Sequence, residues 1–409
     1  MTPNPRRLIL RGLGQIERDD AAVSQAVLRT LLDGPDAKSL DDRDRGFITE
    51  CFYGILRWRL RLDTTIGHFA KKGVPSDPEL ANLLRLGVYQ LLFLDRVPSH
   101  AAIHTTVNLT KRTRGAPVSR FVNAILRSVD RERWQPDDLA SLWGHPKWMV
   151  ERMKREEEGD MTRVEQRLEA NMSAAPTMLR LHPSTPIDAI SGAVPSSHVP
   201  HHVVLPHSGT EILAGIRAGK WLSQDESSAR VVHYLDPQPG DRILELCAGR
   251  GVKTTQLADA VGPSGLVVSV DVSAGRLVEN QRLLKRWAPD VPVYSLAADA
   301  TELLPLDPEV RFDRILIDAP CSGLGVIRRR PETLWRRQED DIQTLASIQR
   351  QMVNAVASWL KPDGHCVYAV CTTTAEETTD IVGHCSVASF STSVEKGSAD
   401  GFYAAKLAL

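Results

Sequence analysis

The sequence contains few cysteines, and their spacing closes no disulfide framework. The six cysteines stand at positions 51, 247, 321, 366, 371 and 385 of 409, without a Cys-x-x-Cys pair. This spacing excludes a small disulfide-bonded domain and the common zinc sites, so we expect no metal centre. Any cysteine that matters to function should therefore act as a thiol.

The sequence also lacks a long apolar run. No segment approaches the roughly 18 consecutive apolar residues that a membrane-spanning helix needs. The apolar run Leu8–Leu10 is too short for the core of a signal peptide. We therefore expect a soluble, cytoplasmic protein with no membrane partner.

The sequence has almost no net charge, but its charges are distributed unevenly. The total is −1, whereas residues 57–133 hold 14 basic and 6 acidic side chains. Such an excess favours a polyanionic partner for this part of the chain. The alternative is an ordinary solvated helical surface.

The pattern of apolar residues divides the chain into four parts. Residues 1–135 have helical spacing, with a nearly continuous apolar helix over 79–94 and a helix capped by Ser99, and should form an all-α domain. A linker with short helices is expected over 136–164, and a small α+β subdomain over 165–225. In residues 226–409, strands that begin at Arg242, Leu266, Val293, Arg314 and His365 alternate with helices. This alternation predicts an α/β Rossmann-like domain with a parallel, doubly wound sheet, which binds ligands at the carboxyl ends of its strands.

The first of these strands runs into a glycine-containing turn. A phosphate-binding loop would need glycine directly before Lys253, where Val252 stands, and a dinucleotide fingerprint would need glycine at Thr254. An acidic residue, Glu245, followed by Gly-x-Gly is typical of a loop that binds S-adenosylmethionine. The glycines let the backbone turn sharply and approach a ligand in front of a helix N-terminus.

Carboxylates follow the next two strands. Asp271 ends the second strand, where it can accept hydrogen bonds from ribose hydroxyls, and Asp299 follows the third, near the expected position of an adenine amino group. Each one alone can equally cap a helix. Together with the glycine turn, they favour a nucleoside cofactor.

Two of the cysteines also end strands at this edge. Cys321 follows Asp318-Ala-Pro, and Cys371 follows Tyr368-Ala-Val, whereas the other four cysteines are expected to be packing residues. Two thiols and a carboxylate suit methylation at carbon 5 of a pyrimidine. A thiolate that adds to carbon 6 activates carbon 5, and an acid at the ring nitrogen stabilises the adduct. A second group must then help to remove the carbon-5 proton.

These motifs resemble those of the Sun/Fmu (RsmB-type) 16S ribosomal RNA cytosine-C5 methyltransferases, which have a NusB-like N-terminal domain and a small RRM-like subdomain. The segments that carry the resemblance are Gln224–Ala229, Cys247–Lys253, Asp318–Val326, Arg328–Arg337 and Tyr368–Glu377. The resemblance implies that Cys371 is the nucleophile, that Cys321 assists release and that Asp318 contacts the target base. It implies S-adenosylmethionine as cofactor, held by Cys247, Ala248, Gly249, Arg250, Gly251, Val252, Lys253, Asp271, Arg276, Asp299 and Asp318.

The resemblance also bears on partners. DNA cytosine methyltransferases carry the Pro-Cys thiol alone, so the additional Cys371 implies RNA, with 16S rRNA as the first expectation and a monomeric protein. The alternatives are a transfer RNA methyltransferase of the same mechanism and a non-catalytic RNA-binding assembly factor. The arginines of Arg328–Arg337 and the basic residues of 57–133 are expected to contact RNA phosphates.

The cofactor loop departs from the family pattern, which usually reads Cys-Ala-Ala-Pro-Gly-Gly-Lys. Arg250 replaces the proline and Val252 replaces a glycine. We expect these two side chains to crowd the cofactor without preventing its binding.

Overall fold

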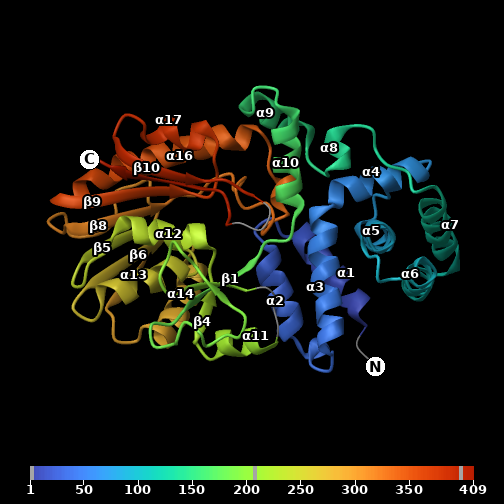
Figure 1. Ribbon diagram of the computed structural model, residues 1–409, viewed down its shortest axis with the longest axis horizontal. Helices are drawn as coiled ribbons and strands as arrows, with labels where there is room; N and C mark the ends of the chain where they lie inside the picture. Colours follow the sequence, from blue (N-terminus) through green and yellow to red (C-terminus); the bar gives the residue numbers. More distant parts are fainter. Residues whose placement is uncertain (1–3, 206–209, 396–398) are drawn as a thin grey trace. The chain divides into compact units, whose positions relative to one another are not determined.

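The computed structural model describes residues 4–205, 210–395 and 399–409, and the chain divides into two compact units. The first unit comprises the chain up to Ala174 and, from much later in the sequence, Ile327–Arg337; the second comprises Ala175–Val326 and Gln338–Leu409. Figure 1 labels their helices and strands. The predicted fold class, a helical N-terminal domain and an α/β C-terminal domain, is confirmed.

The first unit is helical throughout the residues that the structure describes. Its long helices are α1 (Pro5–Arg18), α2 (Ser24–Asp33), α3 (Asp42–Arg57), α4 (Arg59–Phe69), α5 (Pro78–Phe93), α6 (Ser99–Arg114) and α7 (Ala116–Glu132), with a short 3₁₀ turn at Pro35–Ala37. Helix α5 is central, because the eleven consecutive residues Ala81–Leu91 are all buried. Asp77 caps α5 by accepting hydrogen bonds from two backbone N–H groups of its first turn.

Two local expectations differ from the structure. Ser99 is the first residue of α6 rather than its cap, because Pro98 occupies the capping position. The expected linker contains α8 (Leu139–Leu142), α9 (Lys147–Glu156) and the start of α10 (Met161–Met172), whose apolar side chains form a cluster of their own. The first unit extends to Ala174, whereas the sequence analysis ends the helical domain at 135 and begins the α+β subdomain at 165.

The segment Ile327–Arg337 belongs to the first unit although its neighbours in sequence belong to the second. At the end of the short helix α15 (Thr333–Arg336), Arg336 donates hydrogen bonds to the carbonyl oxygens of Ile16, Asp19 and Ala22, at 2.6, 2.8 and 2.6 Å. Carbonyl oxygens at the C-terminus of a helix such as α1 have no partner within the helix. Arg336 therefore completes the end of α1.

Other residues of the segment Ile327–Arg337 also contact the helices of the first unit or are buried. Glu332 accepts a hydrogen bond from the backbone N–H of Ser24 at 3.1 Å, and the ring of Trp335 lies 4.2 Å from the guanidinium of Arg59. Arg328 is buried. The expectation of phosphate contacts is therefore wrong for Arg328 and Arg336, whose side chains are enclosed or bonded to the protein backbone.

The basic residues of 57–133 separate into exposed and internal ones. Arg85 is buried and ion-paired with Glu17 and Asp63, each at an N–O distance of 2.7 Å. Nine of the fourteen are exposed: Lys71, Lys72, Arg96, Lys111, Arg112, Arg120, Arg127, Arg131 and Arg133. The predicted contact with phosphates stays a prediction for these exposed side chains.

The second unit begins with a small antiparallel sheet. Its strands are ordered β2 (Val194–Pro195), β3 (His202–Leu205), β1 (Thr177–Leu181) and β4 (Trp221–Ser223), and α11 (Thr210–Arg217) precedes β4. The indole of Trp221 donates to the carbonyl of Ile212 at 2.8 Å and packs closely on α11, where a Cβ at Gly215 would lie 1.9 Å from the ring. This is the small α+β region that the sequence predicts.

The rest of the second unit is a seven-stranded sheet with helices on both faces (Figure 1). The strand order is β10 (Ser386–Thr392), β11 (Phe402–Leu407), β9 (Leu360–Val370), β8 (Phe312–Asp318), β5 (Arg242–Leu246), β6 (Leu266–Asp271) and β7 (Val293–Ala297). The helices are α12 (Glu226–Leu235), α13 (Val252–Val261), α14 (Ala274–Trp287), α16 (Asp340–Val356) and α17 (Thr379–Val382), with 3₁₀ turns at Ala357–Trp359 and Ala375–Glu377. The five predicted strands are parallel, and β11 and β10 continue the sheet antiparallel.

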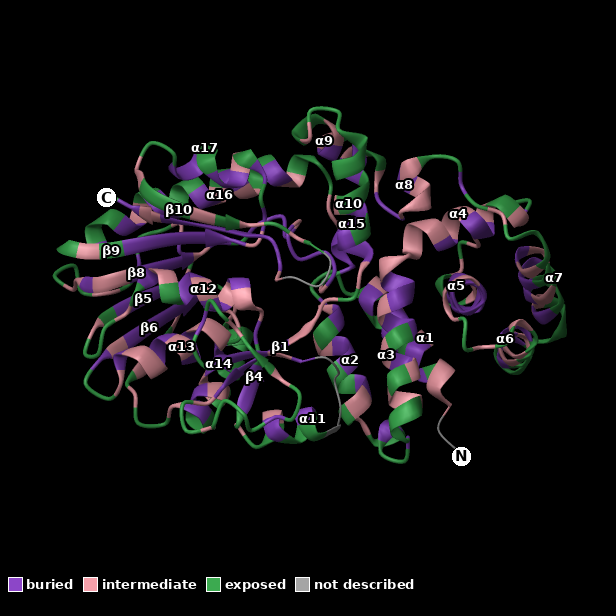
Figure 2. Cartoon of the chain, in the orientation of Figure 1, coloured by how far each residue is buried: buried purple, intermediate pink, exposed green. Residues whose placement is uncertain are grey.

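Side chains alternate between the two faces of this sheet, as the pleat requires. Leu244 and Ile315 pack with α16, whereas Ile243 and Leu316 pack with α12 and α13. Figure 2 shows the inner strands buried. Strand β5 lies between β6 and β8, so the strand order reverses beside β5, and in doubly wound sheets ligands bind at the carboxyl edge at such a point. Among the described residues, every helix is too short or too polar to span a membrane.

Replacing Arg336 by alanine should destabilise the helical unit, because three carbonyl oxygens lose a charged donor. We expect the free energy of unfolding to fall by about 2 kcal/mol, the scale of hydrogen bonds to a charged group. Urea unfolding would measure it, with Arg330→Ala, a change at an exposed arginine of the same segment, as the matched control. Equal stability of the two variants would contradict the assigned role.

Candidate active site

The turn between β5 and α13 has an unusual backbone. Cys247, Gly249 and Gly251 have φ angles of 62°, 57° and 91°, in the left-handed region. A side chain at Gly251 is excluded, because a Cβ there would lie 2.7 Å from the side chain of Asn280 on α14. The turn thereby reaches the N-terminus of α13 at the carboxyl edge of the sheet, where backbone N–H groups suit a polar ligand.

A buried carboxylate braces this turn. Asp271, at the end of β6, accepts hydrogen bonds from the backbone N–H of Gly249 at 2.9 Å and from that of Ser273 at 2.8 Å. The guanidinium of Arg276 lies 3.4 Å from the oxygen that Gly249 contacts. The structure therefore brings together Asp271, Gly249 and Arg276, three of the residues expected at the cofactor.

The remaining expected cofactor residues lie around the same turn. Ala248 donates its backbone N–H to the carbonyl of Val270 at 2.9 Å, and Val252 is the first residue of α13. Arg250 is exposed and lies 3.1 Å from Glu279 on α14, so its side chain is directed toward that helix, and the expected crowding of the cofactor stays a prediction. Asp299 lies just beyond β7 and accepts hydrogen bonds from the N–H and hydroxyl of Thr301, which lower the pKa of its carboxyl.

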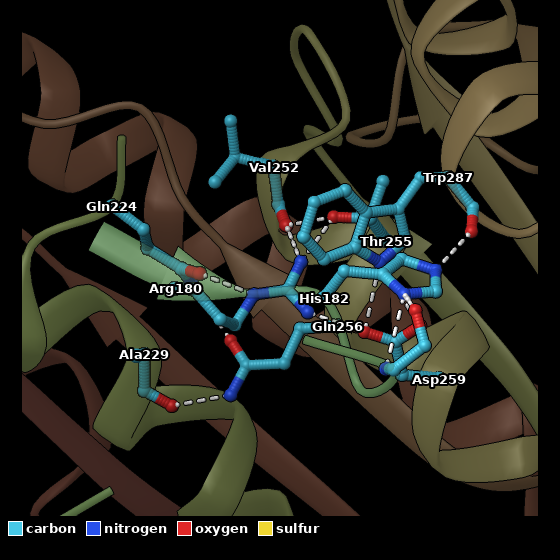
Figure 3. Close-up of polar contacts among 10 residues, drawn as sticks. Arg180, His182, Gln224, Ala229, Val252, Thr255, Gln256, Asp259 and Trp287 are labelled. Atoms are coloured by element: carbon cyan, nitrogen blue, oxygen red, sulfur yellow. Dashed lines mark hydrogen bonds and ion pairs between the residues drawn. The ribbon is translucent and has the colours of Figure 1, made fainter. Parts of the chain in front are cut away.

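The small sheet contacts the start of α13, next to the turn between β5 and α13, through Arg180, which the sequence analysis missed. Its guanidinium, 4% exposed, hydrogen-bonds to Gln224 at 2.8 Å, to the hydroxyl of Thr255 and to the carboxylate of Asp259 (Figure 3). It also lies 4.7 Å from the ring of Trp287, whose indole donates to the same carboxylate. Arg180 thus holds the first turns of α13 in place. The available signal was a charged residue in an otherwise apolar strand.

A carboxylate and an ammonium group face each other across the sheet edge. Lys253, at the start of α13, lies 2.8 Å from Asp318, the last residue of β8. The side chain of Asp318 is 28% exposed, whereas that of Lys253 is 12% exposed. This ion pair joins the start of α13, after the turn between β5 and α13, to the end of β8, which precedes the loop that carries Cys321.

The two thiols expected in the site lie together. The Sγ atoms of Cys321 and Cys371 are 3.2 Å apart, although 50 residues separate them in the chain. Gly325 makes this approach possible, because its N–H donates to the carbonyl of Cys371 at 3.1 Å and a Cβ there would lie 2.1 Å from the carbonyl of Gly401. Its contact with Cys371 and its burial raise the pKa of the Cys321 thiol well above the usual value.

A fully buried carboxyl group lies on β5, just before the turn between β5 and α13. Glu245 of β5 accepts hydrogen bonds from the hydroxyls of Thr254 at 2.6 Å and Ser269 at 3.0 Å, both through one oxygen. Its other oxygen has no hydrogen-bond partner in the structure. Burial raises the pKa of Glu245 to about 7, because a charged carboxylate is poorly solvated there.

The sequence and the fold are both similar to known proteins. The chain matches the family described as 16S rRNA methyltransferase RsmB/F over residues 232–389 and the NusB family over residues 3–131. It is 33% identical over 356 residues to ribosomal RNA small subunit methyltransferase B of Erwinia tasmaniensis, covering 83% of this chain and 81% of that protein. It is 30% identical over 410 residues to the probable ribosomal RNA small subunit methyltransferase B of Bacillus subtilis, covering 92% and 87%.

Solved structures resemble it in fold. The crystal structure of PH0851 covers 100% of this chain and 99% of its own, with a TM-score of 0.83 and 22% identity. NSun6 from Pyrococcus horikoshii, solved with SFG, covers 64% of this chain and 97% of its own, with a TM-score of 0.57 and 18% identity.

The buried Glu245 should make stability depend on pH. Its pKa is raised on folding from 4.5 to about 7, so the folded protein binds the proton more tightly than the unfolded chain. Its contribution is complete below the unfolded value and is lost as the pH rises through about 7, a change on the order of 3 kcal/mol.

The variant Glu245→Gln can place its amide nitrogen at the oxygen that lacks a partner, so it should remove this dependence. Urea unfolding of the wild type and the variant at a series of pH values between about 4 and 8 would measure the difference in stability. Glu309→Gln, at an exposed position, is the control. A stability difference between wild type and Glu245→Gln that does not vary with pH would refute the assignment.

Proposed function

Because the chain belongs to the RsmB/F family of 16S rRNA methyltransferases, we propose that it methylates carbon 5 of a cytosine in 16S rRNA with S-adenosylmethionine as donor. The observation that carries the proposal is the 3.2 Å separation of the Cys321 and Cys371 sulfur atoms at the ends of adjacent parallel strands. RNA binding alone requires neither thiol. Covalent activation of a pyrimidine uses one thiol to attack and a second group to assist release.

The roles of the two thiols are those that the family resemblance implies. The sulfur of Cys371 adds to carbon 6, and Cys321 lies 3.2 Å from it. The new sulfur–carbon bond makes carbon 5 nucleophilic, and carbon 5 then takes the methyl group. Loss of the carbon-5 proton breaks the bond to Cys371, and Cys321 is the neighbouring group that assists this release.

Asp318 and Lys253 act on the base as a pair. The partly exposed carboxylate of Asp318 would contact the polar edge of the target cytosine, while Lys253, 2.8 Å away, balances its charge. The ion pair keeps the orientation of Asp318 constant before the base enters. This arrangement agrees with the role that the family resemblance implies for Asp318.

The residues at the glycine turn fit the cofactor. S-adenosylmethionine, when bound, supplies an electrophilic methyl group on a positively charged sulfur. The carboxylates of Asp271 and Asp299 offer acceptors to hydroxyl and amino donors. Oδ1 of Asp271 accepts the N–H of Ser273 and retains a second lone pair, and Thr301 contacts Asp299 through Oδ1, which leaves Oδ2 for a ligand. At the left-handed residue Gly249 a Cβ would lie no closer than 3.9 Å to another part of the chain, so the backbone there is open to a ligand. The NSun6 structure, which resembles this fold, contains SFG, an analogue of the cofactor.

The thiol roles predict opposite outcomes for two variants. Cys371→Ala should form no covalent RNA adduct and transfer no methyl group, because carbon 6 receives no nucleophile. Cys321→Ala should accumulate an adduct that survives denaturation, because release is impaired. Denaturing gels with labelled 16S rRNA would measure both, and bisulfite sequencing of the RNA would identify the methylated cytosine.

The same gels discriminate the alternatives. An adduct in Cys371→Ala, with none in Cys321→Ala, would reverse the two roles. Adducts on transfer RNA in place of 16S rRNA would change the substrate. A wild-type protein that binds RNA but binds no cofactor and forms no adduct would be an assembly factor.

Asp271 should contribute directly to cofactor binding. We expect Asp271→Ala to weaken the binding of S-adenosylmethionine by about 1–3 kcal/mol, the range for a buried polar group that loses its partner. Calorimetry would measure the affinity, with Asp290→Ala as a control at an exposed aspartate. Wild-type affinity in Asp271→Ala would exclude this residue from the cofactor site.

A further inference from the structure

A single buried carboxylate contacts both loops that carry the thiols. One oxygen of Glu377 accepts hydrogen bonds from the backbone N–H of Ser322 at 2.8 Å and from the side-chain amide of Gln349 at 3.1 Å. Its other oxygen accepts from the hydroxyls of Ser322 at 2.5 Å and Thr374 at 2.9 Å. The residue is 0% exposed, so four protein donors replace water around its carboxylate.

These contacts connect the two thiols through short stretches of chain. Ser322 directly follows Cys321, and Thr374 is three residues after Cys371. The hydroxyl of Ser322 also lies 3.1 Å from that of Thr372, which directly follows Cys371. Glu377 therefore bonds to a near neighbour of each thiol at the same time.

The surrounding elements make this connection rigid. The side-chain amide of Gln349, on α16, also donates to the carbonyl of Pro320 at 2.9 Å, one residue before Cys321. The backbone carbonyl of Glu377 accepts a hydrogen bond from the hydroxyl of Tyr368 on β9 at 2.7 Å. Both loops are thus held to the helix and strand behind them, and a loop bonded to regular elements keeps its geometry better than a free one.

We propose that Glu377 is the positioning residue that holds the thiols of Cys321 and Cys371 at the separation required for release of the methylated RNA, an inference that rests on the proposed function. It does not contact the reacting atoms and acts through Ser322, Thr374 and Gln349. The negative charge of Glu377 also contributes to the raised pKa of the Cys321 thiol, so it helps to keep the proton there.

The spacing of the thiols can be measured directly with diamide. This reagent oxidises two neighbouring thiols to a disulfide and takes up the two hydrogens on its nitrogen atoms. In the full-length wild type, sulfur atoms 3.2 Å apart should join rapidly, and peptide mass spectrometry would identify the Cys321–Cys371 link. The Cys321–Cys371 link cannot form in Cys321→Ser or Cys371→Ser, so any disulfide that forms in these variants involves the other cysteines.

Glu377→Ala should slow this disulfide formation and lower kcat, each by about tenfold, while the KM for RNA stays within about twofold. Glu377→Gln should restore disulfide formation to within about threefold of wild type, because its amide oxygen can accept from Ser322 and Gln349 while its nitrogen faces two hydroxyls that can accept. Asp380→Asn, at an exposed carboxylate on α17, is the matched control and should equal wild type.

A milder variant keeps the test decisive if Glu377→Ala fails to fold. Thr374→Val preserves the side-chain shape and removes one hydrogen bond between Glu377 and the Cys371 loop, so it should slow disulfide formation by about threefold. Wild-type rates of disulfide formation in Thr374→Val, or in a folded Glu377→Ala, would overturn the proposal. So would a parallel loss of cofactor affinity and RNA affinity, which indicates general disruption.

Failure of the proposed function is distinguishable from failure of this inference. The diamide reaction requires neither RNA nor cofactor, so it tests Glu377 even in a protein that methylates nothing. A wild type that forms the disulfide rapidly but methylates neither 16S rRNA nor transfer RNA would refute the proposed function alone. A wild type that methylates RNA but forms the disulfide no faster than Glu377→Ala would refute the inference alone.

Discussion

The parallel pairing of β8 with β9 is the constraint on which the candidate site depends. It places Asp318 opposite Ala369, so both strands end at one level of the sheet edge. The pairing continues beyond the strands, because Ala319 donates to the carbonyl of Ala369 at 3.0 Å and Gly325 donates to that of Cys371 at 3.1 Å. Two thiols 50 residues apart are brought within 3.2 Å by this continuation, and the chemistry of the site follows from it.

Buried carboxylates support this edge, and each is compensated in its own way. Asp271 accepts two backbone N–H groups, and Glu377 accepts four donors, so protein hydrogen bonds replace water around both carboxylates. Glu245 has only two hydroxyl donors, both on one oxygen. Burial raises its pKa, and these two hydrogen bonds offset the rise only in part.

The chain passes from the second unit into the first soon after Cys321 in sequence and returns before α16. Ile327 follows Cys321 by six residues, and Gln338 returns the chain to the second unit ahead of α16. Arg336 and Trp335 contact α1 and α4 within the first unit, so this segment has a structural use for its arginine and aromatic residues. The chain therefore connects the two units at three points in the sequence, after Ala174, after Val326 and after Arg337.

Much of the fold followed from local pattern. Helical spacing predicted the first unit, alternation predicted the five parallel strands, and the spacing of Asp318, Cys321 and Cys371 after strands predicted which residues meet at one edge. These features depend on residues close in sequence or on a rule for parallel sheets, so the sequence by itself determined them. Tertiary structure alone decided that Arg336 completes α1, that Arg180 holds α13 and that Glu377 joins both thiol loops. Each of these contacts pairs a charged side chain with groups from a distant part of the sequence, which local pattern does not reveal. Arg85 is a further example, because only its burial beside Glu17 and Asp63 distinguishes it from the exposed basic residues.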